Sequence, residues 1–161
     1  MHPRAEELIR LLDLEPHPEG GYYRRIYKSE SLVLRGKDGI ERRALTSIYF
    51  LLTEGCVSRW HRVNADEAWH HYEGAILELL SFSADGSVGF SHQLGPLLEG
   101  GSPAHVVPAG WWQAARPLGA YSFVGCTVGP GFEFEDFTLV AELPEESRPV
   151  PPVISDFALF L

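Results

Sequence analysis

The sequence predicts an all-β fold, a sandwich or barrel of short strands preceded by one short helix. From Gly20 onward, short runs rich in aromatic and β-branched residues alternate with turn signals, which is typical of packed antiparallel sheets. The breaks suited to tight turns are Lys37-Asp38-Gly39, Ala84-Asp85-Gly86, Gly100-Gly101-Ser102 and Gly129-Pro130-Gly131. Because a jelly roll buries most strand edges between its two sheets, we expect this architecture.

The pattern of apolar residues and turn signals predicts the following helix and strands in chain order. Residues 4–14 predict an amphipathic helix, because Leu8, Ile9, Leu11 and Leu12 supply an apolar face with helical spacing before Pro16 ends it. The segments that we expect as strands are 22–27, 44–52, 68–82, 86–94, 104–108, 113–115, 121–128 and 137–142.

The domain organisation that we expect is a single domain over residues 1–161. The jelly roll covers 20–143, and a C-terminal arm covers 144–161. The arm ends in apolar residues that we expect to pack on the barrel or on a second subunit: Ile154, Phe157, Leu159, Phe160 and Leu161.

Composition excludes two classes of partner. The chain has 161 residues and a net charge of −9, and this acidic balance repels the phosphate backbone of nucleic acids. No apolar run approaches the roughly 20 residues that a membrane span needs, so no membrane partner is expected. Cys56 and Cys126 lie in apolar runs and favour buried thiols in a reducing compartment, so we expect a cytoplasmic protein.

The most informative motif is GCVSRWHRVNADEAWHHYEG, residues 55–74. Side chains alternate along a strand, so His61 and Val63 face the same way, into the barrel. A short turn through residues 64–66 then lets Glu67 enter from the neighbouring strand. The motif therefore predicts that an imidazole and a carboxyl group converge inside a closed cavity.

The spacing resembles the two-part metal-cupin signature. In the first half, G-x5-H-x-H-x3-E-x6-G, the fixed glycines, the first histidine and the glutamate are in register, but Val63 occupies the second histidine position. In the second half, G-x5-P-x-G-x2-H-x3-N, Pro108 and Gly110 match, whereas Gln113 replaces the third histidine and Pro117 replaces the asparagine. The scaffold pattern is kept while half of the metal ligands are lost.

Longer blocks resemble the cupin-5 group, also called DUF985, of the RmlC-like cupin superfamily. They are HPEGGYYR (17–24), TSIYFLL (46–52), WHR (60–62), DEAWH (66–70), PAGWWQ (108–113) and VGPGFEFEDF (128–137). This resemblance implies a cupin double-stranded β-helix (jelly roll) and a homodimer. It does not supply a chemistry, because one jelly roll hosts enzymes, storage proteins and sensors.

His61 and Glu67 are the candidate catalytic pair. His61 would abstract a proton, Glu67 would orient or activate it, and Tyr121 or Tyr72 would protonate the opposite face. A carboxyl group inside a small barrel needs a metal, a cation or a ligand hydroxyl, unless it forms a structural ion pair with an arginine such as Arg24.

The candidate ligand-binding residues surround this pair. Trp69 and His71 share strand parity with Glu67, Trp112 would form a stacking wall, and Gln113 would hydrogen-bond the ligand. Arg24 would bind a substrate carboxylate or phosphate at the cavity mouth. The alternatives are plain barrel core for each aromatic residue and a surface or structural ion pair for Arg24.

A divalent metal ion would find three candidate ligands: His61, Glu67 and Gln113. Valine cannot donate, and a glutamine carbonyl is a weak ligand for first-row metals, so we favour a metal-free site. Three functions stay open: an isomerase or epimerase acting on a sugar-like metabolite, a non-catalytic metabolite-binding cupin, and a divalent-metal enzyme with an incomplete ligand set.

Overall fold

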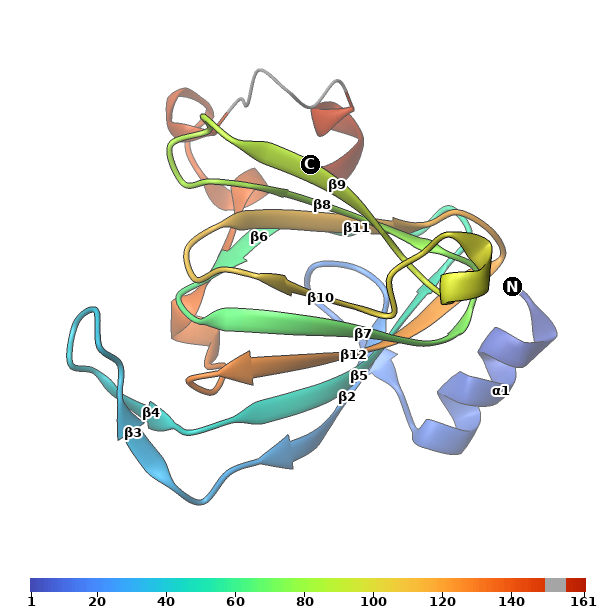
Figure 1. Ribbon diagram of the computed structural model, residues 1–161, viewed down its shortest axis with the longest axis horizontal. Helices are drawn as coiled ribbons and strands as arrows, with labels where there is room; N and C mark the ends of the chain where they lie inside the picture. Colours follow the sequence, from blue (N-terminus) through green and yellow to red (C-terminus); the bar gives the residue numbers. More distant parts are fainter. Residues whose placement is uncertain (150–155) are drawn as a thin grey trace.

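Two antiparallel β-sheets face each other in the computed structural model, which describes residues 1–149 and 156–161 (Figure 1). One sheet has the strand order β1 (Glu15–Pro16), β2 (Tyr22–Lys28), β5 (Thr46–Thr53), β12 (Tyr121–Gly129), β7 (Asp66–Gly74) and β10 (Ala104–Val107). The other has the order β13 (Phe137–Leu139), β6 (Ser58–Val63), β11 (Trp112–Pro117), β8 (Leu77–Phe82) and β9 (Gly89–Leu94). With helix α1 (Pro3–Leu12) ahead of the strands, this confirms the predicted all-β jelly roll.

A separate hairpin projects from the six-stranded sheet. Its strands are β3 (Leu32–Leu34) and β4 (Glu41–Arg43), which the sequence pattern did not predict. They are too short for a clear alternation of apolar and polar residues to appear.

The predicted strand over residues 68–82 is wrong as a single element, because a turn after Gly74 divides it. Gly74 has a φ of 95°, and a Cβ there would lie 2.5 Å from the Tyr121 carbonyl oxygen, so only glycine fits. β7 therefore ends in one sheet and β8 begins in the other. Similarly, the strand predicted over 137–142 stops at Leu139 and continues as a 3₁₀ turn over Val140–Glu142.

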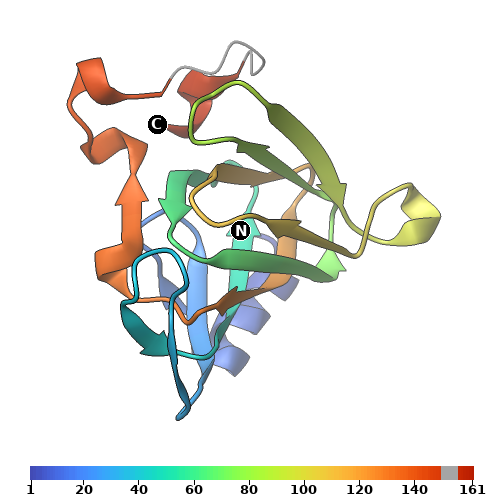
Figure 2. The ribbon, with the colours of Figure 1, turned by 60° about the vertical axis from the view of Figure 1, so that its left-hand side comes forward.

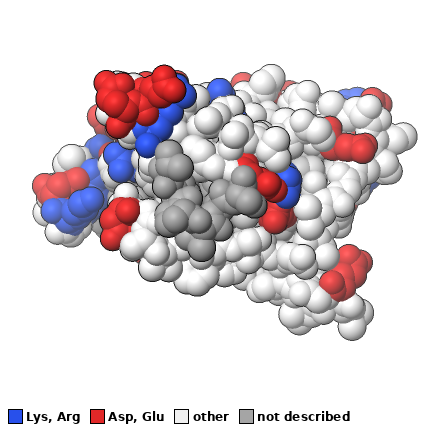
Figure 3. Space-filling model, turned by 90° about the horizontal axis from the view of Figure 1, so that it is seen from above, with Lys and Arg blue, Asp and Glu red and all other residues white. Residues whose placement is uncertain are grey.

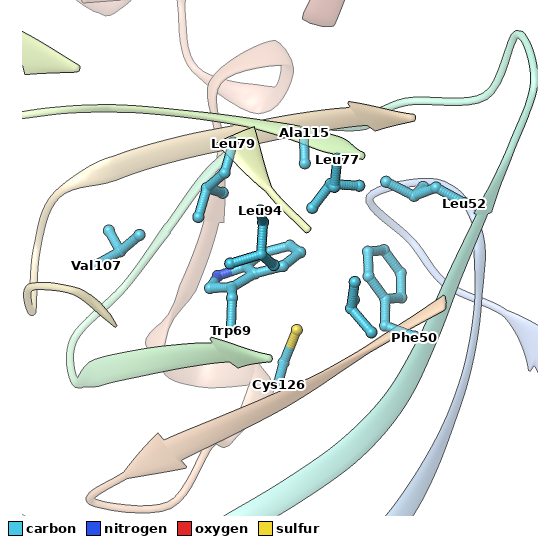
Figure 4. Close-up of a cluster of buried hydrophobic side chains, with 10 residues drawn as sticks. Phe50, Leu52, Trp69, Leu77, Leu79, Leu94, Val107, Ala115 and Cys126 are labelled. Carbon is cyan, nitrogen blue, oxygen red and sulfur yellow. The ribbon is translucent and has the colours of Figure 1, made fainter. Parts of the chain in front are cut away.

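Apolar side chains fill three layers. Ala5 and Leu8 of α1 pack with Leu51 and Phe123 on the outer face of the six-stranded sheet. Figure 4 shows the layer between the sheets, where the Trp69 ring lies among leucine side chains and close to Cys126. The third layer lies between the five-stranded sheet and the C-terminal segment, which Figure 2 shows over that sheet on the side opposite α1.

The C-terminal arm packs on the barrel through two phenyl rings. Phe157 stacks on Trp60 at 5.4 Å between ring centroids, and Phe160 lies 5.8 Å from the same ring. The Trp60 indole N–H also donates to the Phe157 carbonyl at 3.0 Å. Ile154, another of the residues expected to pack, lies outside the described residues.

On the face shown in Figure 3, Lys and Arg side chains lie beside Asp and Glu side chains rather than in one basic patch. Over residues 1–149 and 156–161, every helix is too short or too polar to cross a bilayer.

Two histidines stack where the edge strands β9 and β10 meet. The rings of His92 and His105 are 3.5 Å apart at their centroids, and His92 Nε2 is buried without a hydrogen-bond partner among the described residues. Burial lowers the pKa of His92, and burial together with His92 lowers the pKa of His105. Both rings therefore favour the neutral form in the folded protein.

We predict that this pair makes the fold less stable as the pH falls below about 6.5, the ordinary histidine pKa. There the unfolded chain takes up protons that the stacked rings exclude, so the free energy of unfolding decreases. His17 and His61 act in the same direction, so the comparison needs a double variant, His92→Gln with His105→Gln. Urea titrations from pH 7 to pH 5 should give this variant a shallower loss of stability than the parent. Equal slopes would contradict the prediction.

Candidate functional site

A cavity of about 180 Å³ opens between the two sheets, at the end where β6 passes into β7. Its polar floor contains His17, Glu19, His61 and Glu67. Its other lining residues are Glu15, Tyr23, Arg25, Thr46, Ile48, Phe50, Val63, Cys126, Val128, Phe132, Phe134 and Phe137.

His61 and Glu67 enter this cavity from opposite sheets. His61 lies on β6 of the five-stranded sheet and Glu67 on β7 of the six-stranded sheet, and both are buried. Val63 lines the same cavity, as strand alternation requires. Glu67 comes from the next strand along the chain after a short turn, as the motif predicted, but this strand belongs to the other sheet because the turn between β6 and β7 crosses between the sheets.

Gln113 joins the pair through its carboxamide. Gln113 lies opposite His61 in the β11–β6 register, and its Nε2 donates to His61 Nε2 at 3.1 Å and to Glu67 Oε2. Its Oε1 accepts from the Trp69 indole N–H at 3.0 Å. An indole nitrogen only donates, so the amide oxygen must face Trp69 and both amide hydrogens must face the catalytic candidates.

These contacts determine the tautomer of His61. Its Nδ1 lies 2.8 Å from the Arg59 carbonyl oxygen, which only accepts, so Nδ1 carries the hydrogen. In the neutral ring Nε2 is then an acceptor, consistent with the Gln113 amide that donates to it. The lone pair of Nε2 is the basic site at the cavity floor.

Glu19 completes the floor, and the motif analysis did not identify it as a site residue. Its Oε2 lies 3.3 Å from His61 Nε2, and its Oε1 accepts from the Ser58 hydroxyl at 2.7 Å. The following Gly20 has a φ of 114°, and a Cβ there would lie 2.1 Å from the Val57 carbonyl oxygen. This close approach brings the loop against β6 and places the Glu19 carboxyl in the cavity.

Burial shifts the pKa of every group on the floor toward the neutral form. It raises the pKa of Glu19 to about 8 and that of Glu67 to about 7. It lowers the pKa of His61, although the Glu67 carboxyl acts in the opposite direction, and with His61 it lowers the pKa of His17 to about 3. It also raises the pKa of Cys126, and the charge of the Glu67 carboxyl acts in the same direction.

The donor set does not fit a metal ion. Gln113 is fully buried and is not among the lining residues; its amide hydrogens point at His61 and Glu67, and its oxygen accepts from Trp69. Across the described part of the chain, no three His, Cys, Asp or Glu side chains are placed to hold a metal ion together. Coordination through His61, Glu67 and Gln113 would require the amide to turn and leave the buried indole N–H without its acceptor.

Four of the predicted site residues lie away from the cavity, which corrects the expectation that they line it. The Tyr121 hydroxyl donates to Glu73 on the outer face, near α1. Arg24 also faces α1, where it donates to the Leu12 carbonyl.

The other two lie on the strands themselves. His71 contacts the Ala75 carbonyl oxygen at the far end of β7. Trp112 points to the opposite face of β11 from Gln113, where the Arg62 guanidinium covers its ring. Trp69 is brought to the site, but behind Gln113 rather than in the cavity wall.

Several lining residues were missed by sequence reasoning for one reason: they lie outside the 55–74 motif. Arg25 lines the cavity where Arg24 was expected, one residue away and therefore on the other face of β2. Phe132, Phe134 and Phe137 come from the segment after β12. The blocks HPEGG and GFEFEDF were the available signals, because they place acidic and aromatic residues beside glycine-rich turns.

The chain matches a known protein family over most of its length. The family described as "Cupin superfamily (DUF985)" matches residues 6–140. A hypothetical protein from Leishmania major is 31% identical, with 97% of this chain and 96% of that chain covered and a TM-score of 0.82. A protein from Shewanella oneidensis is 39% identical, with 84% and 83% covered and a TM-score of 0.74.

More distant likenesses show the fold alone. Oxalate decarboxylase from Bacillus subtilis is 17% identical with a TM-score of 0.59, and the likeness covers 84% of this chain and 33% of that one. No curated protein is significantly similar to this chain in sequence.

We predict that Gly20→Ala removes Glu19 from the cavity floor. The added methyl group meets a backbone oxygen and a left-handed φ, so we expect a loss of about 2 kcal/mol or more in the free energy of unfolding. Gly36→Ala is the matched control, because Gly36 has no atom within 4 Å of the added position. Denaturant unfolding of both variants measures the difference, and equal stabilities would refute the role given to Gly20.

Proposed function

Because the chain belongs to the DUF985 family of the cupin superfamily, we propose that its barrel cavity binds a small metabolite and transfers protons on it without a metal. The reaction class that suits this site is isomerisation or epimerisation of a sugar-like compound. The single observation that carries the proposal is the contact of 3.3 Å between Glu19 Oε2 and His61 Nε2.

That contact supports a shared proton. With Nδ1 protonated, His61 Nε2 has one lone pair, and the hydrogen of a neutral Glu19 carboxyl and the Gln113 amide hydrogen share it as an acceptor. A pKa near 7 or 8 lets a carboxyl group both hold and release a proton at neutral pH, as general acid–base catalysis requires. Glu19 thus takes the part of second acid that the sequence suggested for Tyr121.

Each polar residue of the cavity floor has its own role in the proposed reaction. His61 Nε2 takes a proton from the substrate carbon and becomes an imidazolium, with its Nδ1–H held by the Arg59 carbonyl and its charge balanced by Glu67. The Glu19 carboxyl returns a proton to the substrate and becomes a carboxylate. The proton on His61 then passes to Glu19 across their contact, which restores the starting state.

The size and walls of the cavity support a small substrate. Its volume of about 180 Å³ corresponds to the space of about six waters at roughly 30 Å³ each and is below the range typical of drug-sized ligands. Phenyl rings on one side and polar groups on the floor suit a compound with one apolar face and several hydroxyl or amine groups. A non-catalytic binding cupin would use the same groups, so an exchange experiment must separate the two.

We also propose that the chain works as a cytoplasmic homodimer. Its cysteines are free thiols, which supports a reducing compartment. Large apolar side chains are exposed along the edge strands β9 and β10 and the turn between them, namely Phe90, Leu97, Leu98 and Val106. An exposed apolar strip along unpaired strand edges supports pairing with a second copy.

Light scattering tests the dimer. We expect the purified protein to have twice the mass of the 17.9 kDa chain, and Leu98→Lys with Val106→Lys to shift it toward the monomer by placing like charges across the contact. A monomer at micromolar concentration would exclude this proposal.

Solvent exchange tests the chemistry. In heavy water, NMR should show one deuterium entering the carbon next to the carbonyl of a substrate drawn from a panel of aldoses, ketoses and amino sugars. His61→Ala should lower the exchange rate 10²–10⁴-fold, the usual contribution of a general base. Tyr121→Phe is the control and should keep the parental rate.

The pH profile provides a second readout. The rate should change near pH 7 to 8, where Glu67 and Glu19 titrate, rather than near the ordinary glutamate pKa of about 4.3. Glu19→Gln should move this inflection. Binding of a panel compound without exchange would identify a non-catalytic binder, and retained exchange in His61→Ala would remove His61 from the mechanism.

A further inference from the structure

Acidic groups outnumber basic ones around the cavity. Three carboxyl groups line it, from Glu15, Glu19 and Glu67, whereas Arg25 is the single Lys or Arg among its lining residues. Arg25 lies on exposed β2 at the rim, and neither Glu19 nor Glu67 forms an ion pair with a Lys or Arg within the described residues. The charge of Arg59 acts on Glu19 in favour of its ionised form, but Arg59 forms no ion pair with it, so in the described part of the chain the deep end of the cavity holds acidic groups without a directly paired Lys or Arg.

One of these carboxyl oxygens faces acceptors only. Glu19 is 6% exposed, and the side chains that approach its Oε2 are His61 through Nε2 at 3.3 Å and His17 through Nδ1 at 3.5 Å. His61 Nε2 carries no hydrogen because it is the acceptor for the Gln113 amide, and His17 Nδ1 accepts from the Glu19 backbone N–H. An ionised Glu19 would therefore face two lone pairs, so it needs either its own proton or a donor supplied by a ligand.

A further part of the wall, beside His17 and His61, is built from three phenyl rings that meet at steep angles. Phe132 lies 5.1 Å from Phe134 and 5.9 Å from Phe137, with interplanar angles of 83° and 65°. Phe134 and Phe137 are 6.3 Å apart at 81°. A group placed at the centre of these three rings would lie within about 6 Å of each of them, the range over which a cation is attracted to an aromatic ring.

We infer that the ligand of this cavity carries an ammonium group, which lies between the phenyl rings of Phe132, Phe134 and Phe137 and the carboxyl groups of Glu19 and Glu67. The ammonium group supplies the hydrogens or the positive charge that Glu19 lacks, and the aromatic wall attracts the same charge. The substrate class is therefore an amine-bearing small metabolite. This inference rests on the proposal that the cavity is the functional site, and it does not depend on the reaction there.

An anionic ligand is the competing possibility, and Arg25 is the group that would bind it. Arg25 is exposed at the rim and shares that rim with Glu15, which opposes its charge. An anion placed deeper would find no Lys or Arg side chain among the described lining residues there, and each floor carboxyl group would repel it once ionised. The buried groups therefore favour a cation.

The number of protons released or taken up on binding distinguishes a cationic ligand from an anionic one. The pKa of Glu19 is about 8 and that of Glu67 about 7, so both hold protons near neutral pH in the free protein. An ammonium group stabilises their ionised forms, so binding at pH 7 should release about one proton. An anion would do the opposite and cause proton uptake.

Titration calorimetry with probes of matched shape tests the inference. The ammonium probes are choline and ethanolamine, the neutral probe is 3,3-dimethylbutan-1-ol, and the anionic probe is 3,3-dimethylbutanoate. We expect an ammonium probe to bind roughly tenfold or more tightly than the neutral probe. Repeating the titration in buffers of different ionisation enthalpy should show proton release. Tighter binding of the neutral or anionic probe, or no binding of either ammonium probe, would overturn the inference.

Variants locate the binding site. Glu19→Gln and Glu67→Gln should each weaken ammonium binding and reduce proton release. Phe134 is exposed, and Phe134→Leu should weaken ammonium binding without changing the number of protons released per bound ligand. The matched controls are Glu99→Gln and Phe90→Leu, which lie on the edge away from the cavity and should leave the affinity unchanged. Equal affinity in the cavity variants and the controls would place the probe elsewhere and refute the inference.

Different results would refute the proposed catalysis and the proposed ligand class. Ammonium binding without solvent exchange leaves the charge of the ligand established and removes the catalysis. Exchange on neutral or anionic compounds, with no preference for ammonium probes, keeps the catalysis and removes the ligand class.

Discussion

The carboxamide of Gln113 is the contact on which the polar end of this barrel depends. Its oxygen accepts the buried Trp69 indole N–H, so both of its hydrogens must point at His61 and Glu67. This orientation makes His61 Nε2 an acceptor and leaves no amide oxygen for a metal ion. The neutral forms of the surrounding groups follow from burial around this fixed amide.

The walls of the cavity depend on a different part of the chain. The segment with Phe132, Phe134 and Phe137 is tied to the β3–β4 hairpin by ion pairs, in which Arg35 and Arg42 both contact Asp136 at 2.9 and 2.7 Å. The Arg35 and Asp136 side chains are buried, so this pair is held more rigidly than a surface salt bridge. A hairpin without cavity residues therefore positions the aromatic wall.

One set of contacts in the cavity bears on the proposed reaction, and a different set bears on the charge of the ligand. A proton shared by Glu19 and His61 concerns what the site does, whereas the unpaired carboxyl groups and the phenyl wall concern what enters it. Both features follow from excluding water from acidic groups. In water these carboxyl groups would be ionised and solvated, and neither the shared proton nor the demand for a cation would arise.

Strand alternation and turn chemistry are local properties, so the sequence alone determined the helix that ends before Pro16, the succession of short strands, and the common face of His61 and Val63. Alternation says which residues share a face, but not which face becomes the interior. Packing between distant segments decided that Arg25 rather than Arg24 reaches the cavity and that Tyr121 faces outward. It also decided that a loop glutamate, Glu19, meets an imidazole about 40 residues away in sequence. Only the assembled sandwich places these groups together and excludes water from them, because desolvation depends on every neighbour at once.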